Sequence, residues 1–200
     1  VAGQRLDAVV GASVFDSLMA MRLDARKGGA GAVESDLAQL IDQALELASA
    51  DYDMKKRFDF RRIRIVRDYD PAAPKVPCQP QQIQQVIFNV LRNGAEAMHE
   101  AIETGKMDRP PQFTLRTRRE NDRLRIEIED NGPGMTEAVQ RRVFEPFFTT
   151  KPAGKGTGLG LSVSYFIVTQ NHGGQMWVES EPDRGARFIV RLPLEGRAAT

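Results

Sequence analysis

A glycine-rich stretch, "AGKGTGLGLS" at residues 153–162, has the composition of a loop that binds phosphate. Small residues leave backbone N–H groups accessible, and such groups ahead of a helix attract anions. Two common phosphate loops do not fit. The Walker pattern would need glycine in place of Thr149 and a hydroxyl residue in place of Gly156. The dinucleotide pattern would need glycine in place of Leu161 or Val163. The stretch therefore predicts an anion site of another kind.

A carboxylate ends the strand expected at residues 123–130. Alternation places one row of apolar residues toward the core, namely Leu124, Ile126 and Ile128. Asp130 is the next residue on that face, and a buried carboxylate needs a hydrogen-bond donor from the protein or from a ligand. In the following "DNGPGM", Gly132 and Gly134 would let the backbone approach a ligand closely. The alternative is a turn in which Asp130 caps its own backbone.

Two asparagines lie four residues apart on the helix expected from about Pro80 to Ile102. Helical geometry places Asn89 and Asn93 about 40° from each other, on the edge of the apolar arc of this helix. Their carboxamide oxygens could bind Mg²⁺, which takes few protein ligands together with substrate phosphates. The alternative is a pair that only solvates the flank of the helix. His99 is expected on the opposite, solvent-facing side.

The segment "VFEPFFTTK" at residues 143–151 combines three phenylalanines with no helical or strand periodicity. This pattern predicts a hydrophobic latch that holds a loop against the body of the domain. Thr149, Thr150 and Lys151 would supply polar groups near whatever the loop covers.

The elements that must position these residues are strands and helices without strict alternation. Helices are expected at about 36–50, 80–102, 136–142 and 161–171, and strands at 62–68, 113–118, 123–130, 175–181 and 186–194. Ser35 or Asp36 is expected to cap the first of these helices, and His172 to cap the end of the last. This order predicts an α/β fold, a two-layer α+β sandwich with helices on one face of a mixed sheet.

The composition is that of an ordinary globular protein. Of the 200 residues, 41% are hydrophobic and 28% are charged, and the formal net charge of +1 gives no reason to expect nucleic acid or an anionic membrane as partner. The lone Cys78 suits a reducing compartment, and the apolar run "AVVGASVF" is too short to span a membrane. We expect a cytoplasmic chain, with any membrane anchor outside this sequence.

Four segments, in order, resemble the conserved boxes of the catalytic ATP-binding domain of bacterial sensor histidine kinases. "QVIFNVLRNGAEAM" resembles the N box, "DNGPGM" the G1 box, "FEPFFTTK" the F box and "GTGLGLS" the G2 box. This family belongs to the GHKL superfamily, with gyrase B, mismatch-repair and heat-shock chaperone ATPases. The resemblance covers roughly residues 33–194 and implies a Bergerat-type ATP-binding fold.

The resemblance implies that the chain binds ATP and Mg²⁺. Asp130 would accept a hydrogen bond from the adenine amino group, and Asn93 would bind Mg²⁺ with Asn89 assisting. The other implied nucleotide-binding residues are Gly132, Gly134, Thr150, Lys151, Lys155, Gly156, Thr157, Gly158, Leu159, Gly160 and Leu161. Hydrolytic members of the superfamily have glutamate in place of Asn89. An amide is a poor base, which favours phosphoryl transfer to an imidazole over ATP hydrolysis.

Three residues depart from the family pattern. Gly94 replaces the usual alanine, which is expected to loosen the helix slightly. Glu96 stands where some members have a basic residue near phosphate, so no phosphate role is assigned to it. Ala186 replaces a hydroxyl residue that would support a water-mediated contact to adenine.

The phosphoacceptor is missing, because neither His99 nor His172 lies in an H box of the form HExxxP. Residues 1–31 are expected to form a helix and linker resembling the second helix of a dimerisation hairpin, residues 32–195 the catalytic domain, and residues 196–200 a tail. We therefore expect a fragment of a protein-histidine kinase. It would donate the γ-phosphoryl group to a histidine on a dimerisation domain, for relay to a response regulator, within a full-length homodimer.

Two other functions remain open at this point. A degenerate, non-catalytic nucleotide-binding module could act through its N-terminal helix and a partner. A serine kinase acting on an anti-sigma partner would share the same nucleotide site.

Overall fold

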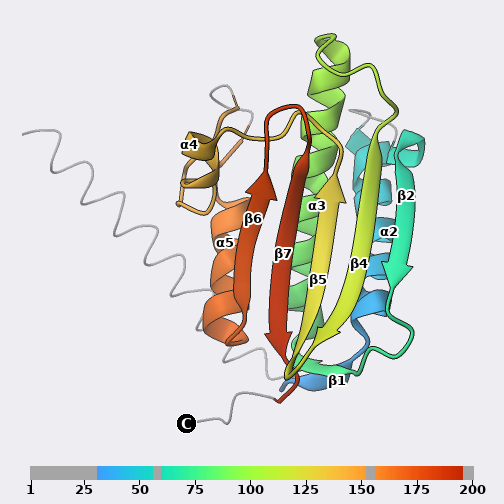
Figure 1. Ribbon diagram of the computed structural model, residues 1–200, viewed down its shortest axis with the longest axis vertical. Helices are drawn as coiled ribbons and strands as arrows, with labels where there is room; N and C mark the ends of the chain where they lie inside the picture. Colours follow the sequence, from blue (N-terminus) through green and yellow to red (C-terminus); the bar gives the residue numbers. More distant parts are fainter. Residues whose placement is uncertain (1–30, 56–59, 152–155, 196–200) are drawn as a thin grey trace, which may run out of the picture. The chain divides into compact units, whose positions relative to one another are not determined.

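The computed structural model describes residues 31–55, 60–151 and 156–195, and in this part a five-stranded sheet is covered on one face by helices (Figure 1). The helix expected within residues 1–31 and the tail at 196–200 lie outside the described residues. The two-layer architecture with helices on one face confirms the expected fold class.

The sheet is mixed, as predicted, with the strand order β2-β4-β5-β7-β6. Its strands are β2 (Arg64–Tyr69), β4 (Gln112–Glu120), β5 (Arg123–Asp130), β6 (Gln175–Ser180) and β7 (Ala186–Pro193). Only the β2–β4 pair is parallel among these, and the other neighbours are antiparallel. A separate two-stranded ribbon pairs β1 (Val33–Ser35) with β3 (Val76–Cys78). The sheet order places β5 at the centre, so the end of β5 lies inside the fold.

Three helical segments cover the sheet: α2 (Leu37–Lys55), α3 (Pro80–Glu103), and α5 (Gly160–Phe166), which continues into the π-helical η2 (Ile167–Asn171). The short elements η1 (Phe60–Arg62) and α4 (Glu137–Gln140) lie in connections. Asp36, not Ser35, caps α2, because its carboxylate accepts hydrogen bonds from the N–H groups of Ala38 and Gln39. No helix in the described ranges is both long and apolar enough to cross a membrane.

The apolar arc of α3 forms the centre of the core. Its buried members are Ile83, Val86, Ile87, Val90, Leu91, Ala95 and Met98, and they pack against the inward row of β5. His172 adds a polar connection between helices. Its Nε2 accepts a hydrogen bond from Gln79 N–H at 3.1 Å, and its Nδ1 lies 2.9 Å from the carbonyl oxygen of Ile167. Burial lowers the pKa of His172, which suits a neutral ring in this role. The predicted cap therefore also anchors the start of α3.

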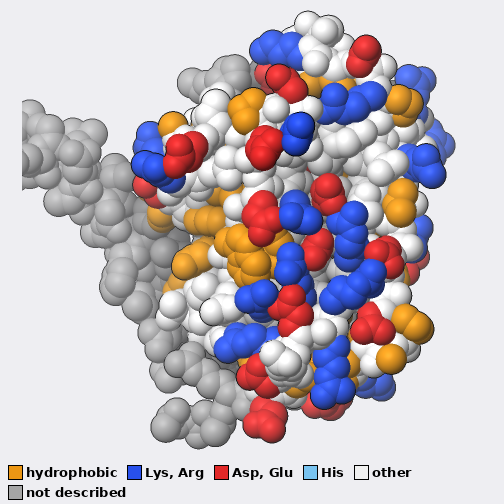
Figure 2. All heavy atoms as spheres, viewed as in Figure 1, with side chains coloured by type: hydrophobic (Ala, Val, Ile, Leu, Met, Phe, Trp, Pro, Cys, Tyr) orange, Lys and Arg blue, Asp and Glu red, His pale blue; other side chains and the backbone are white. Residues whose placement is uncertain are grey.

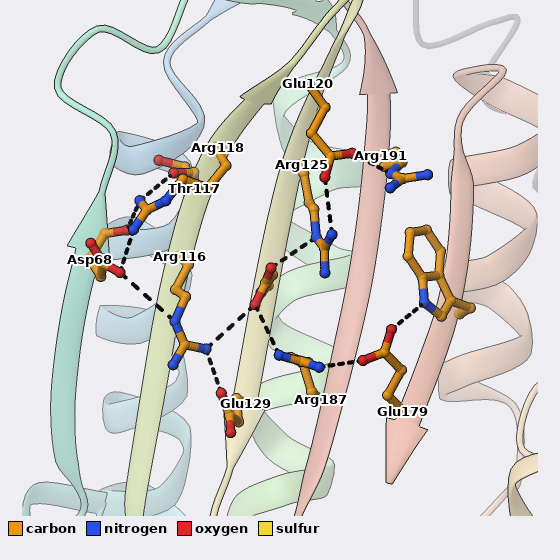
Figure 3. Close-up of polar contacts among 12 residues, drawn as sticks. Asp68, Arg116, Thr117, Arg118, Glu120, Arg125, Glu129, Glu179, Arg187 and Arg191 are labelled. Carbon is orange, nitrogen blue, oxygen red and sulfur yellow. Dashed lines mark hydrogen bonds and ion pairs between the residues drawn. The ribbon is translucent and has the colours of Figure 1, made fainter.

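The opposite face of the sheet carries interleaved charges, and no helix within the described residues covers it (Figures 1 and 2). Figure 3 shows arginines and carboxylates of neighbouring strands pointing toward one another across this face. Glu127 on β5 lies at the centre, with Arg125 Nε at 2.9 Å, Arg116 Nη1 at 3.4 Å and Arg187 Nη1 at 3.8 Å. Cross-strand pairs of opposite charge stabilise a sheet while keeping this face hydrated.

Replacing Glu127 by glutamine is expected to lower the free energy of unfolding by roughly 1–2 kcal/mol, because its side chain is 11% exposed and faces three arginines. Glu137→Gln is the matched control, since Glu137 and Arg141 are 77% and 73% exposed and pair within one helical turn. Urea unfolding measures both variants. Equal, near-zero changes in the free energy of unfolding of the two variants would contradict the stabilising role of Glu127.

Candidate functional site

A cavity of about 620 Å³ lies between α3, the end of β5 and the segments on either side of residues 152–155. Most of the residues that the sequence singled out line it together: Asn93, Asp130, Gly134, Thr150, Lys151, Gly156, Thr157, Gly158, Gly160 and Leu161. Asn89, Gly132 and Leu159 lie outside its wall, and Lys155 lies outside the described residues. Three stretches that are far apart in sequence therefore form one concave site, as such sites usually do.

Asp130 is a buried carboxylate on the wall of this cavity. It is the last residue of β5 and is buried, as the alternation predicted. Its Oδ1 accepts hydrogen bonds from Gly132 N–H at 2.9 Å and Ala186 N–H at 3.3 Å. Within the described part of the chain, no hydrogen bond reaches Oδ2. Oδ1 thus caps the local turn, which was the alternative interpretation, while Oδ2 is left to accept from a ligand.

Burial controls the ionisation of Asp130. Desolvation raises the pKa of this carboxyl group to about 6, against the two backbone N–H groups, which lower it. The group is still ionised near neutral pH, but at a cost that a hydrogen-bond donor from a ligand would offset.

Gly94 makes room for the Phe113 ring beside this carboxylate. A Cβ atom at position 94 would lie 2.8 Å from Cε1 of Phe113 and 3.1 Å from Oδ2 of Asp130. Phe113 is fully buried and pairs with Asp130 across β4 and β5. The departure from the usual alanine is therefore explained by the Phe113 ring, which occupies the space that a methyl group would need.

Sequence reasoning missed Arg109, which fixes the loop after Asp130. Its Nε donates to the carbonyl oxygen of Asn131 at 2.9 Å, and its Nη2 donates to those of Gly132 at 3.0 Å and Asp183 at 2.8 Å. The side chain of Asn131 adds two bonds to the backbone, from Gln112 N–H and to the Pro110 carbonyl. Arg109 lies in a proline-rich connector without periodicity, so no sequence pattern indicates its partners.

The two asparagines of α3 have different positions. Asn93 lines the cavity, whereas Asn89 is buried and its amide nitrogen donates to Gly160 O and Ser164 Oγ, each at 3.1 Å. Asn89 therefore fastens the first turn of α5 to α3, and its burial rules out a purely solvating role. Its Oδ1 lies 3.9 Å from the position that a Cβ atom would take at Gly160.

The donor set of the cavity suits a cation that arrives with its own oxygen ligands. No group of three or more His, Cys, Asp or Glu side chains in the described ranges could hold a metal ion. A carboxamide such as that of Asn93 can supply one hard oxygen, and Mg²⁺ commonly completes its shell with phosphate oxygens and water. The residues present therefore fit Mg²⁺ bound together with a polyphosphate.

One of the three phenylalanines holds this segment against the body of the domain, as the predicted latch requires. Phe144 packs against Tyr165 and Phe188, with ring centroids 5.2 Å and 6.3 Å away. Phe148 lies under the Arg142 guanidinium at 4.4 Å. Phe147, however, is exposed and does not contribute to the predicted latch. One ring is enough to anchor this segment, because Phe144 alone reaches the core cluster.

The backbone of Phe147 closes the base of the loop instead. Phe147 N–H donates to Gly158 O at 3.0 Å, and both residues have positive φ, 63° and 66°. A Cβ atom at position 158 would lie 2.4 Å from the carbonyl carbon of Phe147. Only glycine allows this close approach at position 158.

Further charged side chains on the cavity wall complete the site. Arg92, which the sequence analysis did not select, lines the cavity beside Asn93. Glu96, three residues after Asn93, forms an ion pair with Lys151, the residue that ends the "FEPFFTTK" segment. Lys151, one of the two lysines predicted to bind phosphate, is thus held by a carboxylate.

The chain matches the family described as histidine kinase-, DNA gyrase B- and HSP90-like ATPase over residues 78–196. It is 33% identical over 165 residues to sporulation kinase E of Bacillus subtilis. This alignment covers 82% of this chain and 20% of the relative. It is 38% identical over 134 residues to the sensory histidine kinase/phosphatase NtrB of Salmonella typhimurium, covering 66% of this chain and 37% of the relative. The chain therefore spans well under half the length of these curated relatives.

Solved structures show the same fold. The catalytic domain of histidine kinase ThkA superposes with a TM-score of 0.64 at 28% identity, over 82% of this chain and 95% of that chain. The mycobacterial sensor histidine kinase MprB gives a TM-score of 0.64 at 22% identity, over 83% of this chain and 99% of that chain, a likeness of fold alone.

Proposed function

Because the chain belongs to the family of histidine kinase-, DNA gyrase B- and HSP90-like ATPases and is an ATP-binding catalytic domain of the sensor histidine kinase type, we propose that it binds Mg-ATP in this cavity and donates the γ-phosphoryl group to a histidine. In that step the bond from the γ-phosphorus to its bridging oxygen breaks, a bond to an imidazole nitrogen forms, and ADP leaves.

The observation that carries this proposal is the position of Asp130. Its Oδ1 is held by two backbone N–H groups, so Oδ2 has a fixed direction in the cavity. A buried, ionised acceptor in a fixed direction selects a ligand with a matching donor, as the amino group of adenine provides.

The other end of the cavity suits a polyphosphate. Asn93 would contribute an oxygen ligand to Mg²⁺, with Asn89 holding the start of α5 in place. Lys151 and Thr150, with the backbone of Gly156 to Leu161, would surround the phosphates. A Mg²⁺ ion held there by Asn93 would supply positive charge that offsets the negative charge of the phosphates.

Asn89 also bears on what happens to the γ-phosphoryl group. It occupies the position of the water-activating glutamate of hydrolytic superfamily members, and its amide nitrogen is committed to Gly160 and Ser164. A carboxamide cannot remove a proton from water at neutral pH. We therefore assign this domain to phosphoryl transfer and not to hydrolysis.

The acceptor histidine is supplied by a different segment. His99 lies 3.3 Å from Glu103 within one turn of α3, and His172 is buried in the cap described above. The partners we propose are a histidine-bearing dimerisation domain, in a homodimer of the full-length protein, and a response regulator that receives the phosphoryl group on an aspartate.

The direct test supplies the family's histidine-bearing hairpin together with γ-labelled ATP and Mg²⁺. We expect acid-labile label on the hairpin with the wild-type chain and none with Asp130→Asn. ATP binding without any labelled hairpin would favour a non-catalytic interaction module. Acid-stable label on a serine of an anti-sigma partner would favour a serine kinase, and either result would contradict the proposal.

Replacing Arg109 by lysine is expected to weaken Mg-ATP binding by roughly tenfold while the domain stays folded. A single ammonium group cannot reach the three carbonyl oxygens that the guanidinium holds, so the loop beside Asp130 loses its fixed position. Isothermal titration calorimetry measures the change. Arg119→Lys is the control, because Arg119 contacts a single exposed carbonyl at 3.4 Å. Equal affinities of the two variants for Mg-ATP would show that Arg109 does not support the nucleotide site.

A further inference from the structure

An ion pair joins the two walls of the cavity. Glu96 is on α3 and Lys151 ends the "FEPFFTTK" segment, 55 residues away in the sequence. Their side chains are 30% and 27% exposed, so both are largely shielded from solvent. Both residues line the cavity, and Glu96 lies one helical turn beyond Asn93 on the same wall.

The backbone around Lys151 links this ion pair to the glycine-rich stretch. Lys151 N–H donates to Thr149 Oγ1 at 3.1 Å. A Cβ atom at Gly156 would lie 3.1 Å from that same Oγ1 and 3.2 Å from Cδ of Lys151. The aliphatic part of Lys151 therefore packs against Gly156, and moving the lysine changes what Gly156 contacts.

A lysine held by a carboxylate is not fully available to a phosphate. An ammonium group is a compact point charge with three donors, and it moves to the partner with the greater negative charge nearby. Glu96 carries a single negative charge, whereas a polyphosphate carries several. A carboxylate on this wall is also repelled by phosphate if the lysine does not stay between them.

Resting on the proposed function, we infer that Glu96 is a positioning residue that holds Lys151 at the cavity wall before nucleotide enters. Nucleotide entry exchanges the Glu96 carboxylate for a phosphate oxygen on the Lys151 ammonium group. Glu96 thereby competes with the nucleotide for Lys151, and weakly charged ligands displace it less well than a triphosphate does. The affinity of the site is set partly by this competition.

A double-mutant cycle tests the exchange. Glu96→Gln is expected to tighten Mg-ATP binding about fivefold, roughly 1 kcal/mol, because the lysine is released in advance. In a Lys151→Met background the same substitution is expected to change the dissociation constant by less than about twofold, since there is no lysine to release. Glu100→Gln is the matched control, because it removes the same charge from the same wall of α3.

Two results would overturn the inference. An equal gain in Glu100→Gln, or a gain from Glu96→Gln that persists without Lys151, would mean that Glu96 acts only through the overall charge of the cavity. A tighter complex that depends on Lys151 would support the exchange.

A second measurement uses no nucleotide and so separates this inference from the proposed function. The side-chain NMR signals of Lys151 are expected to shift in ligand-free Glu96→Gln and to stay in place in Glu100→Gln. Unchanged signals in Glu96→Gln would overturn the pairing. Failure of the wild-type chain to bind Mg-ATP would instead overturn the proposed function.

Discussion

Replacing Asp130 by asparagine is expected to weaken Mg-ATP binding by about 100-fold or more, and at the same time to stabilise the ligand-free domain. The first effect follows from hydrogen-bond polarity. Oδ1 of the asparagine can still accept from Gly132 and Ala186, which leaves the amide nitrogen where Oδ2 now lies. A donor then faces the donor of the adenine amino group, and both lose a hydrogen bond in a buried place.

The second effect follows from the raised pKa. Burial raises the pKa of Asp130 from its ordinary value of 3.8 to about 6 in the folded domain. The folded state therefore binds a proton more tightly than the unfolded state does. The stability that this proton adds to the folded state is fully present below pH 3.8. This stabilisation of the folded state is lost as the pH rises through about 6. The full difference between the two pKa values corresponds to a free energy of order 3 kcal/mol. Asparagine carries no charge and avoids that cost.

Thermal unfolding between pH 4 and pH 8, with calorimetric titration of Mg-ATP, measures both effects. We expect Asp130→Asn to unfold at a higher temperature than wild type at pH 8 and to lose that advantage near pH 4. Asp122→Asn, in the exposed turn between β4 and β5, serves as the control and is expected to change neither quantity. Unaltered Mg-ATP binding by Asp130→Asn would exclude Asp130 as the residue that recognises adenine.

Replacing Asn93 by alanine is expected to abolish most of the effect of Mg²⁺ on ATP binding. Asn93 presents a carboxamide oxygen from α3 to the cavity, at the end that we propose to hold the phosphates. With Mg²⁺ present, we expect the affinity for ATP to fall by roughly 30-fold, or about 2 kcal/mol. With the cation chelated, wild type and Asn93→Ala are expected to bind ATP equally weakly.

Titrations of ATP at several Mg²⁺ concentrations measure this dependence. Gln85→Ala is the matched control, because it removes a carboxamide from the exposed side of α3 and is expected to keep the wild-type response. A Mg²⁺ response in Asn93→Ala that matches wild type would place the cation elsewhere.

The parts of the site that follow from local periodicity could be predicted from the sequence. Alternation along residues 123–130 put Asp130 on the buried face, and helical spacing put Asn93 on the edge of the α3 arc. Both predictions concern which side of one element a residue takes, and that is fixed by backbone geometry alone. The order of the five strands follows from no such pattern, because it depends on how distant segments pair.

The contacts that escaped prediction join segments far apart in the sequence. Arg109 reaches Asp183, 74 residues away, and Lys151 reaches Glu96, 55 residues away. Long flexible side chains of this kind have no periodic signature, so their partners appear only when the backbone is in place. The same holds for Asn89, whose spacing suggested a cation ligand while its amide nitrogen is bonded to α5.

The most direct test of the account compares ATP with inosine triphosphate, which has an oxygen in place of the adenine amino group, in titrations of the wild-type chain with Mg²⁺. The two ligands present the same ribose and phosphates and differ only at one edge of the base, where the adenine amino group becomes a carbonyl and N1 gains a hydrogen, so their difference reports on the edge that Asp130 is proposed to bind. We expect inosine triphosphate to bind about 100-fold more weakly than ATP, and Asp130→Asn to remove most of this difference. Equal affinity of the wild-type chain for the two nucleotides would contradict this expectation.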